Sequence, residues 1–114
     1  MLKYHNIKSV CRHGHKHDSK REANRCDELN LLRKGGVIKD LKQQPKFVLQ
    51  PSFKYQGKTI RAITYTADFS YRDCERKCFV VEDCKGFKTK TYQQKKKMLL
   101  YIMRDRKDFN FMES

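Results

Sequence analysis

The sequence lacks any long hydrophobic run. Its longest apolar stretch covers residues 98–103, whereas a helix that crosses a bilayer needs roughly 20 such residues. The first residues show no apolar segment of the kind that a secretory signal contains. We therefore expect no membrane insertion and a location in the reducing cytoplasm.

Acidic residues are scarce. The 114 residues include 13 Asp and Glu against 27 Lys and Arg, which gives a formal net charge of +14. This excess favours an anionic partner, either a nucleic acid or an anionic membrane surface. The hydrophobic content of 38% is low but sufficient for one small core. We expect a basic N-terminal arm at residues 1–17, followed by a single domain at residues 18–114.

The sequence has no CxxC pair, and its five cysteines are odd in number. An odd number argues against a complete disulfide framework. Cys74 and Cys78 are four positions apart, so a structural zinc site that also uses His13, His15 and His17 is an alternative. We favour free thiols, with the histidines belonging to an arm that contacts DNA or is disordered.

A helix is expected from about residue 18 to residue 34. Ser19 and Glu22 fit a capping box, in which the two side chains satisfy free amides at the start of the helix. A glycine pair then supplies a stop. Helical spacing places Glu22, Cys26 and Leu29 on one face, with Glu22 at the head of the buried stripe.

Strand patterns dominate the middle of the chain. From Ile63 to Tyr71 the odd positions are apolar and the even positions are polar, as in a strand with two different faces. The expected order is α-β-β-β-α-β, an α/β or α+β layer in which helices flank a mixed central sheet. After the first helix, the expected elements are strands at 46–50, 59–71 and 79–85, a helix at about 91–104 and a strand at 109–112.

The hairpin between the second and third strands brings two carboxylates together. If its turn is centred near residues 75–76, paired positions sum to 151, and Asp68 lies opposite Asp83 with their Cβ atoms about 5 Å apart. Two like charges at this distance favour a cation between them, and Mg²⁺ prefers oxygen ligands. Lys85 shares the face of Asp83, whereas Glu82 points to the opposite face.

These residues suggest a site for phosphodiester chemistry. Mg²⁺ at Asp68 and Asp83 would polarise a phosphate and lower the pKa of an attacking water. The Lys85 ammonium would stabilise negative charge on the phosphate or help to orient and deprotonate the water. The carbonyl of Cys84 would add an oxygen ligand. Glu22 would act as a ligand of a second metal or a water, or only as the helix cap.

The set formed by Glu22, Asp68 and Asp83-x-Lys85 on a helix and two strands resembles the PD-(D/E)XK nuclease superfamily. This resemblance implies a restriction-endonuclease-like core with catalytic roles for these four residues. Ala67 stands where the superfamily has proline. The acid two positions before the lysine is aspartate instead of glutamate, which shortens its reach by one methylene.

A closer resemblance comes from Phe69 after the first aspartate and Gly86 after the lysine. At these two positions the sequence is similar to the phage endonuclease I group, the Holliday-junction resolvases that cut branched DNA. Over residues 18–100 the chain is similar to a family of small phage proteins of unassigned function. The similar stretches lie at residues 18–23, 44–50, 63–69 and 81–89.

The resemblance implies a Mg²⁺-dependent (or Mn²⁺-dependent) endonuclease for duplex or branched DNA in phage recombination or genome processing, with a homodimer as a candidate assembly. A non-catalytic DNA-binding or RNA-binding module on the same fold is the alternative, and a basic protein that binds RNA or a host protein is a third. Binding to phosphates should weaken steeply with salt. The expected DNA contacts are Lys88, Lys90, Gln93, Lys95 and Lys96.

Overall fold

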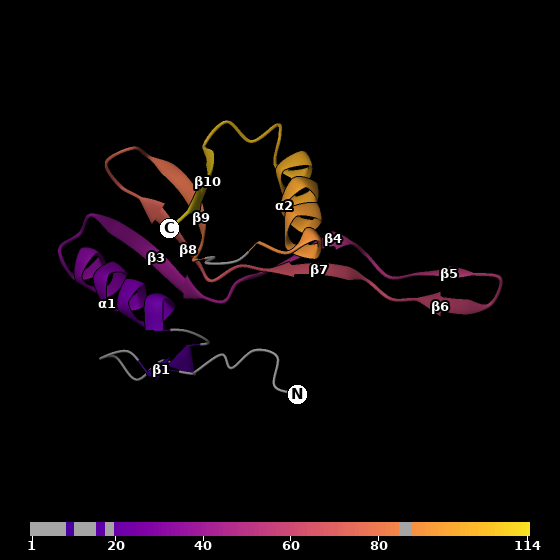
Figure 1. Cartoon of the computed structure of the whole chain (residues 1–114). Helices are drawn as coiled ribbons and strands as arrows, with labels where there is room; N and C mark the ends of the chain where they lie inside the picture. The colour runs from indigo at the N-terminus through magenta and orange to yellow at the C-terminus, as the bar shows by residue number, and fades with distance from the viewer. Residues whose placement is uncertain (1–8, 11–15, 18–19, 85–87) are drawn as a thin grey trace.

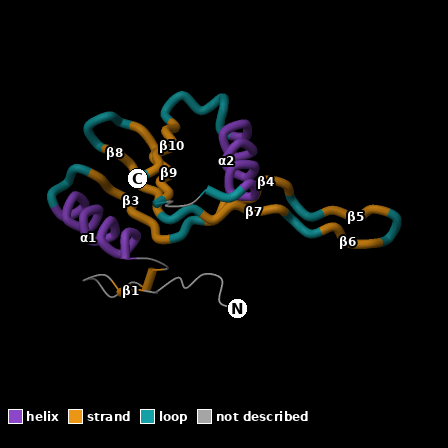
Figure 2. Tube along the Cα trace, viewed as in Figure 1, coloured by secondary structure: helices purple, strands orange, loops and turns teal. Residues whose placement is uncertain are grey.

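The computed structural model describes residues 9–10, 16–17, 20–84 and 88–114, which form two helices and ten strands (Figures 1 and 2). In chain order these are β1 (Ser9–Val10), β2 (Lys16–His17), α1 (Lys20–Lys34), β3 (Ile38–Gln43), β4 (Lys46–Gln50), β5 (Phe53–Tyr55), β6 (Lys58–Ile60), β7 (Ile63–Thr66), β8 (Phe69–Asp73), β9 (Cys78–Asp83), α2 (Lys90–Ile102) and β10 (Phe109–Glu113).

The central sheet has the strand order β10-β9-β8-β3. β8 runs antiparallel to both β3 and β9, whereas β10 runs parallel to β9. A parallel pair needs a long crossover, and α2 lies in the connection from β9 to β10. The predicted α/β class with a mixed central sheet and two helices is therefore confirmed.

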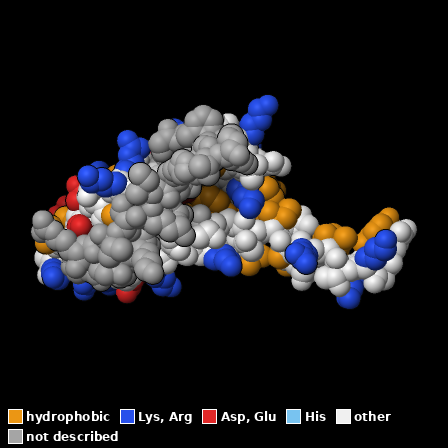
Figure 3. Space-filling model, turned by 60° about the horizontal axis from the view of Figure 1, so that its bottom comes forward, with side chains coloured by type: hydrophobic (Ala, Val, Ile, Leu, Met, Phe, Trp, Pro, Cys, Tyr) orange, Lys and Arg blue, Asp and Glu red, His pale blue; other side chains and the backbone are white. Residues whose placement is uncertain are grey.

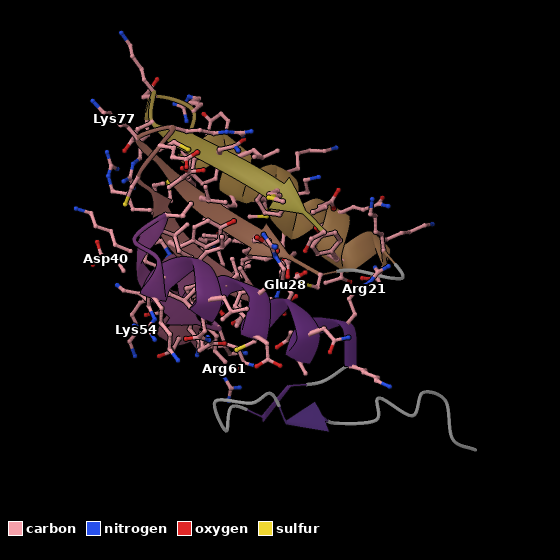
Figure 4. All side chains as sticks on the ribbon, turned by 90° about the vertical axis from the view of Figure 1, so that its left-hand side faces the viewer. Arg21, Glu28, Asp40, Lys54, Arg61 and Lys77 are labelled. Atoms are coloured by element: carbon pink, nitrogen blue, oxygen red, sulfur yellow. The ribbon has the colours of Figure 1, made fainter. Side chains whose placement is uncertain are left out.

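The two helices cover opposite faces of this sheet (Figure 4). Side chains of a β-strand alternate between faces. On β9, Val80 packs into the cluster that contains Cys26 and Leu29 of α1, and Val81 packs into the cluster that contains Tyr92 and Leu99 of α2. We call these two sides the α1 face and the α2 face.

Helix α1 buries the stripe that its sequence predicts. Glu22 is 3% exposed, and Cys26 and Leu29 are fully buried. The helix ends as expected at the glycine pair, where Gly36 adopts a φ of 79° and the amide of Val37 bonds to the carbonyl of Leu32. The serine of the predicted capping box lies outside the described residues.

The prediction of one long strand at residues 59–71 is wrong, because this segment forms β6, β7 and β8, which belong to three different sheets. The chain changes sheets at Ala67 and Asp68, whose backbone groups bond to Pro45 and Gln44. The apolar alternation of the sequence runs through this point, but the buried side changes: Tyr65 and Ala67 are buried on the α2 face, whereas Phe69 and Tyr71 of β8 are buried on the α1 face.

The sequence prediction also missed β3, the edge strand of the central sheet. Its residues are mostly polar, only Ile38 is buried, and its pairing with β8 shifts register between Lys39 and Lys42. Asp40 inside this irregularity has a φ of 55°. The predicted strand at residues 46–50 is confirmed as β4, but it pairs with β7 outside the central sheet.

Two smaller antiparallel pairs complete the fold. Strands β1 and β2 pair with each other beside α1. Strands β5 and β6 form a hairpin that continues from β4 and β7 and projects from the rest of the molecule (Figures 1 and 2). Within the described part of the chain, neither helix has the length and apolar character needed to cross a bilayer.

Candidate functional site

The β8–β9 hairpin has the register that the sequence predicts for Asp68 and Asp83. Phe69 pairs with Glu82, and every further pair of this ladder also sums to 151. One further pair in the same register would set Asp68, just before β8, opposite Asp83 at the end of β9. The backbone N–H of Cys84 donates a hydrogen bond of 2.7 Å to Asp68 Oδ2, which ties the two chain segments together at this point.

The predicted acidic site residues are all buried. Asp68 is 9% exposed, Glu22 is 3% exposed and Asp83 is fully buried. Burial of a carboxylate is costly unless hydrogen bonds or positive charge compensate it. Three buried acids at the edge of a small core are therefore unusual, and the same chain keeps a net charge of +14.

The charge of Asp68 acts on a titratable group of each face. Burial raises the pKa of the Cys84 thiol to about 11, and the charges of Asp68, Glu82 and Glu22 add to this rise. On the α1 face, the charge of Glu22 therefore acts on the same thiol as the charges of Asp68 and Glu82.

The α2 face shows the other side of the same arrangement. Burial raises the pKa of the Tyr92 hydroxyl, and the hydrogen bond to Glu113 and the charges of Asp83, Glu113 and Asp68 raise it further. The charge of Asp68 therefore acts on groups of both faces, together with that of Glu22 at Cys84 and that of Asp83 at Tyr92.

Glu82 points away from Asp83 and serves as a structural partner. Its carboxylate accepts hydrogen bonds from Arg25 Nε at 2.6 Å, from the Tyr71 hydroxyl at 2.7 Å and from Ser114 Oγ at 2.7 Å. Burial by itself would raise the pKa of Glu82, but Arg25, Ser114 and Tyr71 hold it below its usual value. This network joins α1, β8, β9 and the residue after β10.

A further acid, Glu113, was not predicted to belong to the site. It accepts a 2.5 Å hydrogen bond from the Tyr92 hydroxyl and forms ion pairs of 3.2 Å with Lys88 and Lys96. These donors, Tyr92 foremost, lower the pKa of Glu113 to about 2. Glu113 pairs with Asp83 in the parallel β10–β9 ladder. The sequence prediction considered only the antiparallel hairpin and so did not include this pairing.

The predicted DNA-contacting residues are divided between two sides of α2. Lys88, Gln93 and Lys96 line a hollow of about 370 Å³ together with Glu113. Lys95 lines a different hollow beside β7. Lys90 is exposed at the first position of the helix.

Several predicted metal or catalytic residues remain untested. Lys85 and Gly86 lie outside the described residues, as do His13 and His15, and only the backbone of His17 is described. Cys74 and Cys78 are free thiols. Across residues 20–84 and 88–114, no group of three or more His, Cys, Asp or Glu side chains is arranged to hold a metal ion.

The pair of aspartates nevertheless matches the donor chemistry of a hard cation. Mg²⁺ is commonly bound by one or two carboxylates, while waters and substrate phosphates fill its other positions. Asp68 and Asp83 supply such a pair. Glu22 is not grouped with them as a third ligand, so its role remains that of a buried acid at the head of α1.

Comparison with known proteins assigns the chain to a family. No curated protein sequence and no solved structure matches it. The model of the family described as "Protein of unknown function (DUF1064)" matches residues 1–113, and the chain therefore belongs to this family.

Proposed function

We propose that the chain is a metal-dependent endonuclease that hydrolyses phosphodiester bonds in duplex or branched DNA. The observation that carries the proposal is that Asp68 and Asp83 are both buried and that the β8–β9 register, extended by one pair, would set them opposite each other. The net charge of +14 supports a polyanionic substrate. The arrangement of acids on a helix and two strands, which resembles the PD-(D/E)XK superfamily, supports this reaction class.

The two aspartates are the proposed ligands of Mg²⁺ or Mn²⁺, and the carbonyl of Cys84 is a further oxygen donor. When bound, the cation would polarise the scissile phosphate and lower the pKa of a nucleophilic water. The hydrogen bond from Cys84 N–H fixes the orientation of the Asp68 carboxylate. A ligand held in this way requires little reorganisation during the reaction.

Lys85 and Glu22 have supporting roles in the proposal. Lys85, which lies outside the described residues, follows Asp83 by two positions, and from the sequence pattern we expect its side chain on the side of Asp83. Its ammonium would stabilise the charge that develops on the phosphate. Glu22 approaches from α1, where its charge and that of Asp68 act on the same Cys84 thiol, so we assign it to a water near the site.

The lysines beside α2 would receive the DNA backbone. Lys88 and Lys96 are held by Glu113 at the rim of the hollow next to Tyr92. A phosphate that enters this hollow would compete with Glu113 for the two ammonium groups. Binding by this route should weaken with salt, because each phosphate contact releases counterions.

The test is cleavage of a supercoiled plasmid and of a synthetic four-way junction, with Mg²⁺ or Mn²⁺ and again with EDTA. We expect Asp68→Asn and Asp83→Asn each to reduce the cleavage rate by at least about a hundredfold, because each loses a ligand charge that stabilises the transition state. The matched control is Asp105→Asn, an exposed residue after α2, which should cut like the parent.

Two results would contradict the nuclease proposal. One is that the parent chain cuts neither DNA with either metal. The other is that Asp83→Asn cuts as fast as the parent while its thermal unfolding shows that the fold is intact.

A non-catalytic nucleic-acid-binding module is the second candidate function. It is favoured by the net charge of +14 and by the finding that the described side chains form no group of three metal ligands. A gel shift that survives Asp68→Ala and falls with salt, without cleavage, would support this function. Competition with single-stranded RNA would then show which nucleic acid is preferred.

A further inference from the structure

The β5–β6 arm, which we define as residues 51–62, stands free of the core. Each of its residues is exposed, and Figure 1 shows it extending away from both helices. The radius of gyration is 16.0 Å, against about 13 Å for a compact chain of this length. The arm is a formed hairpin, since Gln56 and Gly57 adopt φ values of 50° and 76°, as a tight two-residue turn requires.

The two faces of the arm differ in chemistry. Phe53 pairs with Ile60 and Tyr55 pairs with Lys58, so the three apolar side chains share one face with Lys58, whereas Lys54 and Thr59 lie on the other. They are 46% (Phe53), 38% (Ile60) and 62% (Tyr55) exposed. Figure 3 shows hydrophobic and basic side chains next to one another along this projection. Exposed apolar surface that the core does not use indicates a binding surface.

The charge of this region selects the kind of partner. Residues 41–67 contain five Lys or Arg and no acidic residue. On the arm itself the cations are Lys54, Lys58 and Arg61, and Figure 4 shows the labelled Lys54 and Arg61 side chains pointing outward. Two copies of such an arm would repel each other, whereas a phosphate backbone complements it.

We infer that the β5–β6 arm is a DNA-binding ribbon whose cations contact phosphates and whose aromatic face contacts bases. The inference takes its partner, DNA, from the proposed function. A two-stranded ribbon is narrow enough to enter the major groove. Phe53 and Tyr55 can stack on bases that are unstacked at a branch or a bulge, because aromatic stacking tolerates any base.

The first test removes charge from the arm of the full-length chain. Fluorescence anisotropy with labelled four-way junction and plain duplex, in EDTA, measures binding without cleavage. For Lys54→Gln/Lys58→Gln we expect weaker binding of both DNAs and a slope of log affinity against log salt that is shallower by up to about 1.8, at about 0.9 for each lost phosphate contact.

The control for this variant removes equal charge elsewhere. Arg76→Gln/Lys107→Gln changes two exposed cations, one in the turn between β8 and β9 and one between α2 and β10. Both segments lie away from the arm (Figure 1), so the salt slope should stay close to that of the parent. Equal slopes for the two double variants would overturn the inference.

The second test removes the aromatic face. Phe53→Ser/Tyr55→Ser should lower affinity for the junction at least about fivefold, because base stacking is lost, and should affect plain duplex less. Both residues are exposed, so the core should fold as in the parent, which circular dichroism would verify. Unchanged junction affinity would overturn the base-contacting role.

Other occupants of the arm would give different results. Light scattering could show that the parent is a dimer and that the arm variants are monomers with intact DNA affinity. This result would mean that the arm binds a second copy, and it would overturn the inference. Cosedimentation with anionic vesicles that depends on the arm, again with DNA affinity intact, would overturn it in favour of a lipid surface.

The arm and the nuclease site can fail separately. If the arm variants lose DNA binding but the parent cuts no DNA, the arm inference stands and the nuclease proposal fails. If the parent cuts DNA and the arm variants bind like the parent, the nuclease proposal stands and the arm inference fails.

Discussion

Glu82 and Asp83 are neighbours on β9, both are fully buried, and they face opposite sides of the central sheet. On the α1 face, Glu82 is enclosed by a guanidinium and two hydroxyl groups that donate to it. On the α2 face, the charges of Asp83 and Asp68 both help to raise the pKa of Tyr92. Adjacent acids of similar burial therefore have different surroundings: Glu82 joins several segments of the fold, whereas Asp83 is the acid that we propose as a metal ligand.

The α1 face supports the site on the α2 face. Arg25 contacts Glu82 from α1. Ser114 makes two contacts from the end of the chain: its hydroxyl donates to Glu82, and its backbone N–H donates to the carbonyl of Asp83. The network thus fixes the end of β9, which carries Asp83. Preorganised acids of this kind need a rigid support to keep their geometry.

The largest expected effect tests the structural side of this comparison. Glu82→Ala should lower the free energy of unfolding by about 3 kcal/mol, because it leaves the partly buried Arg25 without its main partner. Asp83→Asn should cost clearly less stability while it removes cleavage. Urea unfolding followed by circular dichroism measures both, and equal losses of stability would break the contrast between the two faces.

A double variant separates loss of the pair from loss of packing. In Arg25→Met/Glu82→Leu, both charges are replaced by apolar groups of similar volume, and such replacements of buried ion pairs are often neutral or stabilising. We expect most of the stability lost in Glu82→Ala to return. No recovery would show that the remaining donors, Tyr71 and Ser114, dominate the network.

The next effect concerns a single donor of that network. Burial and the bond to Glu82 raise the pKa of Tyr71, so its hydroxyl remains a proton donor across the working range. Tyr71→Phe should cost about 2 kcal/mol, as expected for a hydrogen bond to a charged group. Tyr101→Phe changes a hydroxyl on a side chain that is 65% exposed, and it should leave the unfolding midpoint unchanged.

Local patterns predicted the helices and the hairpin register well, for physical reasons. The α1 stripe, the glycine stop and the sum of 151 depend on neighbours in the sequence. The strand break at Ala67 and Asp68 and the edge strand β3 depend on pairing with distant segments. Apolar alternation through Phe69 is the same whether a strand stays in one sheet or moves to another.

The candidate site also contains residues that short-range patterns predicted and residues that depend on distant segments. Asp68, Asp83 and the opposite orientation of Glu82 followed from strand parity and turn position. Glu113 reaches the site through a parallel strand that returns after α2, and no short-range pattern encodes that return. The donors around Glu82 likewise come from α1, β8 and the end of the chain, so strand parity gave the direction of Glu82 but not its hydrogen-bond partners.

The smallest effect tests the α2 face through its pH dependence. Tyr92, Lys88 and Lys96 stabilise the charged form of Glu113 and lower its pKa from the usual value of 4.5 to about 2. A lowered pKa stabilises the fold above pH 4.5, and this contribution is lost as the pH falls from 4.5 towards about 2. Solvent screening limits it to about 1 kcal/mol.

Glu113→Gln should therefore flatten the unfolding free energy between pH 4.5 and about 2 relative to the parent. Asp108, whose pKa Arg106 also lowers, titrates in both chains and cancels in the difference. Glu28→Gln, at an acid whose side chain is 63% exposed on α1, should reproduce the parent curve. If the unfolding free energy of Glu113→Gln depends on pH as strongly as that of the parent, Glu113 does not hold Lys88 and Lys96. These lysines would then be open to phosphate in the hollow next to Tyr92, without the competition that the proposed function assumes.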